Sequence, residues 1–320
     1  MKVKFSSPGK ITLFGEHAIV YGKPAIVSAI DKRVYISMEE RNDGIIKIIS
    51  DLSSISISIN EINNYNGPLI YVIKAIEILS NYIGKKKGVN IIINSEMPIS
   101  AGLGTSAAVS VATIAAYSKI LNYNININEI AKLGHKVELE VQGIASIMDT
   151  TISTFGGIMY IKPNDIIEKI KIDYEISFIL GYIKREYNTA YMVNKVKSLM
   201  NKNKEIIEKI MEAIGLIVEE GKKAILEEDI EKIGLLMNIN HGLLDSLGVS
   251  NKELNDMVYS VRRAGALGAK LTGAGGGGCI LALCPNNKDV KDNICNAIES
   301  VGGKPIPIIL SEEGLKEIKN

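Results

Sequence analysis

The sequence has no tryptophan, few cysteines and no excess of charge. Cys279, Cys284 and Cys295 form no CxxC pair and have no histidine close in sequence, which argues against a zinc or redox motif. A small, odd number of cysteines fits a reducing compartment. The 37 basic and 36 acidic side chains, spread over both halves, argue against nucleic-acid binding as the main role.

Long apolar runs are also missing. Stretches such as residues 91–93 are far shorter than the about 20 residues that cross a bilayer. Residues 1–9 lack the apolar core of a signal peptide. We therefore expect a cytoplasmic protein without nucleic-acid or membrane partners.

Of two common nucleotide-binding signatures, one is absent and the other occurs only in the wrong structural context. The Walker A pattern is absent, which disfavours a P-loop NTPase. Residues 273–278 match the dinucleotide pattern but precede an expected strand, where that pattern needs a helix. Residues 102–107 match it before a helix, but residues 97–101 separate them from the preceding strand, and no acidic residue ends a second strand downstream. A Rossmann oxidoreductase is therefore disfavoured.

The chain has 320 residues, 46% of them hydrophobic and 23% charged, which favours two packed globular domains. Short runs rich in Ile and Val predict strands at 1–6, 25–29, 34–39, 45–50, 55–59 and 89–93, followed later by 153–161. Apolar periodicity predicts helices at 69–83, 105–121, 127–141, 189–199, 204–220, 230–247 and 252–263. Strands at 176–181, 279–283 and 305–309 complete an α+β pattern. We place the domains at 1–165 and 166–320. Capping boxes are expected at Asn126 with Glu129 and at Ser250 with Glu253.

A first glycine-containing segment spans residues 8–25. Lys10, Glu16 and His17 are ionisable side chains within an apolar stretch, where an unpaired buried charge is costly. The spacing alone leaves open whether these groups are functional or belong to an exposed hairpin.

A second segment, residues 98–108, leads into an alanine-rich helix. A loop that enters a helix N-terminus offers free N–H groups and the positive end of the helix dipole, which suits phosphate. Thr105 and Ser106 can add hydroxyls for phosphate or Mg²⁺. A simple N-capped helix is the alternative.

A third segment, residues 270–279, has five glycines in the six positions 273–278. Each glycine costs backbone entropy, so such a run suits close approach of the backbone to a ligand better than packing. A flexible loop is the alternative.

Acidic residues follow the second segment. Glu138 borders the apolar stripe of its helix and can reach inward, more readily than Glu140. Asp149 stands alone among apolar residues and a Thr/Ser run, either as a turn residue or as a functional group.

Phosphoryl transfer needs a phosphate cradle, a divalent cation, a cationic side chain and a carboxylate for the acceptor's proton. The sequence offers residues 102–108, Ser106 with Glu138, Lys10 and Asp149 for these parts.

In this order and spacing, the three glycine segments resemble the motifs of the GHMP kinases, and residues 8–25 resemble the branch that phosphorylates mevalonate. The resemblance implies an N-terminal domain like ribosomal protein S5 domain 2, a ferredoxin-like C-terminal domain and an active site in the cleft between them. It also implies ATP with Mg²⁺, mevalonate as the acceptor and a possible homodimer. A phosphomevalonate kinase, a diphosphomevalonate decarboxylase and a non-catalytic sensor are the alternatives.

The resemblance further implies residue roles. Asp149 and Lys10 are expected to be catalytic, and Ser106 and Glu138 to be magnesium ligands. The expected ATP-binding residues are Glu16, Pro98, Ile99, Ser100, Ala101, Gly102, Leu103, Gly104, Thr105, Ser106, Ala107 and Ala108. The expected substrate residues are His17, Arg185, Thr189, Gly273, Ala274 and Gly275.

Overall fold

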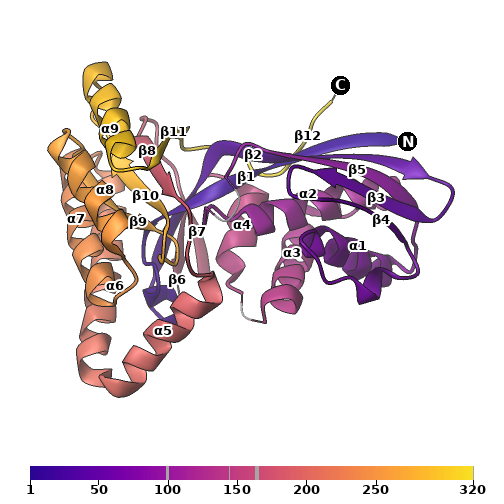
Figure 1. Cartoon of the computed structure of the whole chain (residues 1–320), viewed down its shortest axis with the longest axis horizontal. Helices are drawn as coiled ribbons and strands as arrows, with labels where there is room; N and C mark the ends of the chain where they lie inside the picture. The colour runs from indigo at the N-terminus through magenta and orange to yellow at the C-terminus, as the bar shows by residue number, and fades with distance from the viewer. Residues whose placement is uncertain (99–100, 144, 163–165, 320) are drawn as a thin grey trace.

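The computed structural model describes residues 1–98, 101–143, 145–162 and 166–319, and Figure 1 shows two parts side by side. The N-terminal part is built on an eight-stranded sheet of order β12-β1-β2-β5-β3-β4, with β6 paired to β2 and β7 to β6. Only the β3–β5 pair is parallel among the described strand pairs of this sheet. The strands are β1 (Lys2–Phe14), β2 (Ala25–Arg41), β3 (Ile45–Ser50), β4 (Ser54–Ser58), β5 (Gly88–Ser95), β6 (Ile158–Lys162), β7 (Ile166–Ile170) and β12 (Lys316–Glu317).

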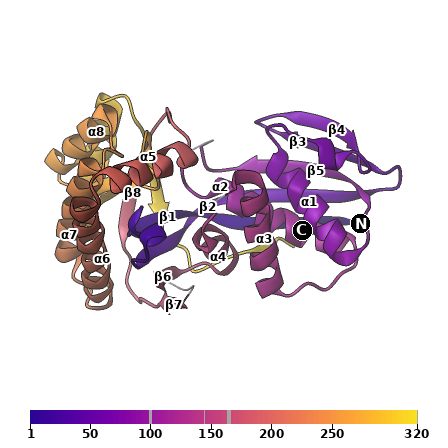
Figure 2. The same cartoon turned by 90° about the horizontal axis from the view of Figure 1, so that it is seen from below.

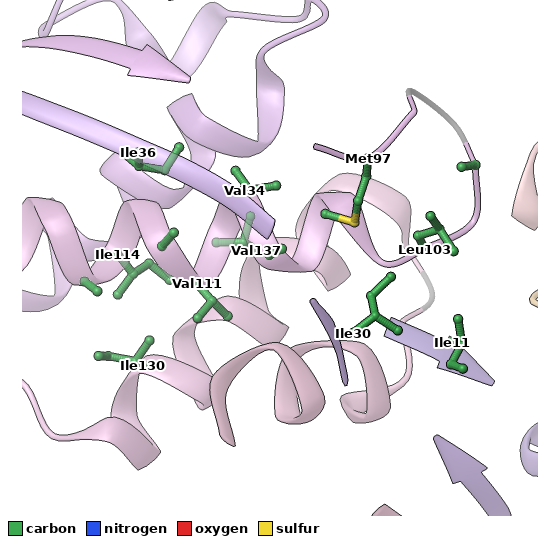
Figure 3. Packing of buried hydrophobic residues seen from close by; sticks show 14 of the residues in the cluster. Ile11, Ile30, Val34, Ile36, Met97, Leu103, Val111, Ile114, Ile130 and Val137 are labelled. Carbon is green, nitrogen blue, oxygen red and sulfur yellow. The ribbon is translucent and has the colours of Figure 1, made fainter. Parts of the chain in front are cut away.

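Helices from the first half of the chain cover one side of this sheet, as Figures 1 and 2 show. They are α1 (Ile70–Ile83), α2 (Thr105–Ile120), α3 (Ile127–Gln142) and α4 (Ile147–Phe155). Helix α2 is buried on nearly all sides, and its small residues allow the sheet and the neighbouring helices to approach closely. In Figure 3, Ile11 and Ile36 of the sheet, Val111 and Ile114 of α2 and Val137 of α3 lie within one hydrophobic core, and all five are at most 1% exposed.

The C-terminal part is a four-stranded antiparallel sheet of order β11-β8-β10-β9. Its strands are β8 (Ser177–Ile183), β9 (Gly268–Thr272), β10 (Gly278–Leu283) and β11 (Lys304–Ile309). Its helices are α5 (Thr189–Lys202), α6 (Lys204–Leu226), α7 (Ile230–Ser246), α8 (Lys252–Arg263) and α9 (Lys288–Ser300). Helices between β8 and β9 and one helix between β10 and β11 give the strand–helix–strand–strand–helix–strand order of a ferredoxin-like domain. The expected two-domain α+β fold is therefore confirmed.

After β11 the chain returns to the N-terminal sheet. Ser311 N–H donates to Ala29 O at 2.9 Å, and Leu315 N–H donates to Thr154 O at 3.0 Å. The buried Arg33 guanidinium donates to the Gly314 carbonyl at 2.5 Å. Residues 311–315, which follow the C-terminal sheet, are thus hydrogen-bonded to the N-terminal part and connect the two parts a second time.

Several sequence expectations need correction. The strands expected at 25–29 and 34–39 are one strand, β2, because the charged residues between them are satisfied within it: Lys32 pairs with Asp31 at 2.8 Å, and Arg33 is hydrogen-bonded inside the protein. Residues 153–155 end α4 and do not begin a strand. Strand β9 and helix α9 were not expected.

The capping box at Asn126 and Glu129 is confirmed, since both of its hydrogen bonds are present. The one expected at Ser250 is wrong. The N-cap of α8 is Asn251, whose Oδ1 accepts from Leu254 N–H at 3.0 Å. The Ser250 hydroxyl donates to Asn255 Oδ1 instead.

The predicted domain boundary falls at residues 163–165, outside the described residues, and it stays a prediction. Within the described part of the chain, every helix is too short or too polar to span a bilayer.

Candidate active site

Lys10 lies in β1, at the junction of the two parts. Its side chain is 6% exposed, and its Nζ forms an ion pair with Asp149 Oδ1 at 3.0 Å. The exposed-hairpin interpretation of the first segment is wrong, because Lys10, Glu16 and His17 are all less than 8% exposed.

Asp149 lies in the first turn of α4, so it is not a loop-turn residue. Ser146 caps this helix by accepting a hydrogen bond from Met148 N–H at 3.1 Å. The cap fixes the start of the helix, and the Asp149 carboxylate reaches Lys10 from there. With 29% of its side chain exposed, Asp149 is accessible to a small ligand, whereas Lys10 is almost enclosed.

Residues 101–104 of the second segment form a loop beside β1 that leads into the N-terminus of α2. Lys10 N–H donates to Leu103 O at 2.8 Å. Gly104 is the N-cap of α2 with φ of 70°, and a Cβ there would lie 2.8 Å from Lys10 Cγ. Glycine at this position therefore allows both the left-handed turn and the close approach of Lys10. Because glycine has no side chain to cap the helix, the first N–H groups of α2 are available to an anion. Ile99 and Ser100, expected to bind ATP, lie outside the described residues.

Ser106 and Glu138 meet beside this helix N-terminus. The Ser106 hydroxyl donates to Glu138 Oε2 at 3.1 Å, and Glu138 is 3% exposed. The other carboxylate oxygen, Oε1, is buried and has no hydrogen-bond partner among the described residues. Burial and the nearby charge of Asp149 raise the pKa of Glu138 to about 7. Such an unsatisfied buried oxygen fits the role of a cation ligand.

Two further residues support this pair and were not found from the sequence. Gln142 Nε2 donates to Glu138 Oε2 at 2.8 Å, and the Tyr71 hydroxyl interacts with both Ser106 and Gln142. Burial, and secondarily the Glu138 carboxylate, raise the pKa of Tyr71. Gln142 follows Glu138 by four residues on one helix face, a spacing visible in the sequence. Tyr71 belongs to α1, and nothing local in the sequence connects it to this site.

Glu140 lies on the outer side of α3. It is 39% exposed, and its carboxylate approaches Lys74 at 3.6 Å and Lys136 at 3.8 Å. The expectation that Glu138 reaches inward more readily than Glu140 is therefore confirmed by the burial of the two side chains.

The third segment is a well-anchored turn between β9 and β10. All five of its glycines have positive φ, between 69° and 93°. Gly276 N–H donates to Val249 O at 2.9 Å, and Gly276 O accepts from Glu186 N–H at 3.0 Å. A Cβ on Gly275 would lie 2.1 Å from the Val249 carbonyl. These contacts contradict the flexible-loop alternative and explain why glycine is required.

The expected acceptor residues gather around this turn. His17 Nε2 is 3.0 Å from the Ala274 carbonyl, and burial is the main cause that lowers the pKa of His17. Arg185 donates through Nε and Nη2 to the Gly275 carbonyl at 3.2 Å, and through Nη1 to Thr189 Oγ1 at 3.2 Å. His17, Arg185 and Thr189 thus come together from both parts of the chain. Glu16 lies deeper, in an ion pair with Lys270.

Two cationic side chains, Lys10 and Arg185, and two carboxylates that differ in exposure therefore lie at one junction with a helix N-terminus and a glycine turn. Within the described ranges, three or more His, Cys, Asp or Glu side chains nowhere gather as a metal site. A cation here would therefore rely on Ser106, Glu138 and groups of a ligand. Mg²⁺ commonly binds in this way, through one or two carboxylates together with substrate phosphates.

Comparison with known families agrees with this arrangement. Residues 70–157 match the GHMP kinases N terminal domain, and residues 222–304 match the GHMP kinases C terminal domain. The chain belongs to the GHMP kinase family and is an ATP-dependent kinase.

Several similar relatives and solved structures are mevalonate kinases. Mevalonate kinase of Thermococcus sibiricus is 43% identical, covering 99% of this chain and 98% of the relative. Mevalonate kinase of Pyrococcus abyssi is 45% identical, covering 97% and 96%. The crystal structure of Methanococcus jannaschii mevalonate kinase superposes with a TM-score of 0.85 at 35% identity, covering 97% and 98%. L. major mevalonate kinase in complex with R-mevalonate gives a TM-score of 0.84 at 25% identity, covering 97% and 96%.

Proposed function

We propose that the protein transfers the γ-phosphoryl group of ATP to the 5-hydroxyl of (R)-mevalonate, an early step of isoprenoid synthesis. The observation that carries this proposal is the ion pair between Lys10 Nζ and Asp149 Oδ1, 3.0 Å long, beside the open N-terminus of α2. The near-full-length similarity to mevalonate kinases supports the choice of acceptor.

ATP is proposed to bind with its phosphates against residues 101–108. The free N–H groups at the start of α2 and the helix dipole suit the negative charge of phosphate oxygens. Ser106 and Glu138 are proposed to hold Mg²⁺, because the Ser106 hydroxyl lies against Glu138 Oε2 and Glu138 Oε1 has no hydrogen-bond partner among the described residues. When bound, Mg²⁺ screens the charge of the phosphates.

The acceptor is proposed to lie between Lys10, Asp149 and the glycine turn. The Arg185 guanidinium suits a planar carboxylate, and Thr189 and His17 line the same region. Recognition of the acceptor's carboxylate at Arg185 would direct its hydroxyl end toward Asp149.

Asp149 then accepts the proton of the acceptor hydroxyl as the oxygen attacks the γ-phosphorus and the bond to ADP breaks. Lys10 holds the Asp149 carboxylate in place and offers its positive charge to the transferring group. Both side chains come from regular elements, β1 and α4, so little reorganisation is required at the moment of transfer.

The test is a coupled ADP-release assay with Mg·ATP and a panel of mevalonate, phosphomevalonate, diphosphomevalonate, galactose and homoserine. We expect turnover with mevalonate alone. Turnover with a phosphorylated acceptor, or with none of the panel, would refute the proposed reaction. A homodimer and a cytoplasmic location stay predictions.

A further inference from the structure

Lys270 is a buried lysine to which neither phosphate binding nor proton transfer gives a role. It lies in β9, immediately before the glycine turn (residues 273–278), and its side chain is 0% exposed. Its Nζ pairs with Glu16 Oε1 and donates to the Leu271 carbonyl at 2.7 Å. Burying a lysine is costly unless it is paired, so the position of Lys270 depends on Glu16.

Glu16 is equally enclosed, with 2% of its side chain exposed. Its second oxygen, Oε2, accepts a hydrogen bond from Asn240 Nδ2 at 3.2 Å, and Asn240 is fully buried in α7. Both carboxylate oxygens are therefore engaged inside the protein. A carboxylate held in this way is poorly placed to contact a nucleotide.

The same two segments of the chain meet at two more points. Thr272 Oγ1 accepts from Thr12 N–H at 3.0 Å and donates to Thr12 O at 3.0 Å. His17 Nε2 contacts the Ala274 carbonyl at 3.0 Å. Residues 12–17 of the N-terminal part are thus connected to residues 270–274 of the C-terminal part by three side-chain contacts.

The glycine turn needs such external anchors. Its five glycines carry no side chains that could fix their positions, and each has positive φ. The hydrogen bonds from Arg185 and Glu186, and the one to Val249, connect the turn to its own domain. These anchors move with the C-terminal part. Across the junction, Thr272 and Ala274 are hydrogen-bonded to residues 12–17, which continue the chain from Lys10. The turn also lies against the 101–102 backbone, where a Cβ on Gly278 would be 3.2 Å from the Ala101 carbonyl.

We propose that Lys270 is a positioning residue of the kinase reaction: through Glu16, with Asn240, it sets the glycine turn at its working distance from the Lys10–Asp149 pair. Glu16 acts through Lys270 and not by contact with ATP. The activity measurements below rest on the proposed function, whereas the exchange measurement needs no substrate.

The first test is a double-mutant cycle of Lys270→Met and Glu16→Gln. Each single change is expected to lower kcat by about 10- to 100-fold, because small displacements of positioned groups have effects of this size. The KM for ATP should stay within about threefold, since a positioning defect acts mainly on the transferring geometry. The double variant should be no less active than the weaker single variant, because Glu16 and Lys270 act as one unit.

A matched control is Lys222→Met. Lys222 of α6 pairs with Glu168 of β7 at 2.7 Å, away from the glycine turn. Its kcat should stay within about twofold of the wild type. If the losses of Glu16→Gln and Lys270→Met multiply in the double variant, or if Glu16→Gln raises the KM for ATP with kcat unchanged, Glu16 contacts the nucleotide directly and the proposal is wrong.

The second test does not require the Lys270→Met variant, so the proposal can still be tested if that variant does not fold. Hydrogen exchange is measured on the ligand-free Glu16→Gln variant, which preserves the shape of the side chain. We expect amides of residues 272–278 to exchange at least about tenfold faster than in the wild type, with Lys222→Met unchanged. Unchanged exchange in this segment would overturn the proposal. Absence of turnover with mevalonate in the wild type would instead refute the proposed function and leave the exchange result standing.

Discussion

Replacing Asp149 with Asn tests the proposed chemistry most directly. Asparagine keeps the shape of the side chain but cannot accept a proton, and it removes the negative charge 3.0 Å from Lys10 Nζ. General-base catalysis contributes about 10²–10⁴-fold. We therefore expect kcat to fall by about that factor, which corresponds to about 3–5 kcal/mol in the barrier.

The structure also predicts what happens to nucleotide binding. The charge of Asp149 is one of the causes that raise the pKa of Glu138. Removing it should lower the pKa of Glu138 and make that carboxylate ionised more fully near neutral pH. The KM for Mg·ATP in Asp149→Asn should therefore be unchanged or lower, although turnover is strongly reduced.

The assay is a rapid-quench single turnover with labelled ATP, saturating Mg²⁺ and saturating mevalonate, together with a thermal melt. Asp256→Asn is the matched control, because Asp256 also pairs with a lysine, Lys252, but at the surface of α8. The control should behave like the wild type. Single turnovers of Asp149→Asn within about threefold of the wild type would refute the general-base role, as would a loss explained by an unfolded fraction in the melt.

Three further predictions concern the cation, the glycine turn and pH. Glu138→Gln should raise the Mg²⁺ concentration needed for half-maximal activity by at least about tenfold, whereas Glu140→Gln should match the wild type; equal titration curves for both variants would remove Glu138 from the metal site. Gly275→Val should weaken ligand binding in calorimetry, because φ is +78° and a Cβ clashes with a carbonyl; wild-type affinity would contradict this. Burial, above all, lowers the pKa of His241 to about 4, so the folded state disfavours the proton that the unfolded state takes up near pH 6.5. Stability present above that pH should be lost as pH falls toward 4, by up to about 3 kcal/mol, in denaturant titrations. Because burial also lowers the pKa of His17, His241→Gln should reduce this dependence and His135→Gln should keep it in full; if both variants keep it in full, another group is responsible.

The parts of the site that the sequence predicts are those encoded locally. The loop of residues 101–108 and its helix are contiguous, so two glycines followed by two hydroxyl residues were enough to indicate an anion site. The inward orientation of Glu138 could be predicted because it borders the buried face of α3. The helix capped by Asn126 was likewise readable from its capping box.

The contacts that the sequence could not predict join residues far apart in the chain. Lys270 and Glu16 are 254 positions apart, and Thr12 and Thr272 are 260 apart. No local pattern distinguishes Lys270 from a surface lysine until β9 places it inside the protein. The same holds for Arg33, which lies between the strands expected at 25–29 and 34–39 and whose partners include the carbonyls of residues near the C-terminus.

The two carboxylates of the site differ in how their charge is balanced, and that difference supports their separate roles. Asp149 has Lys10 at 3.0 Å and remains partly accessible, so a small acceptor can reach it. Glu138 is 3% exposed, its Oε2 receives neutral donors from Ser106 and Gln142, and the influence of Lys10 on its pKa is the smallest of the causes. Among the described residues no ion pair balances Glu138, so its ionised form is favoured once a cation arrives with the nucleotide. Nucleotide binding and the charge state of Glu138 are therefore expected to be coupled, while the Lys10–Asp149 pair is already formed before any ligand binds.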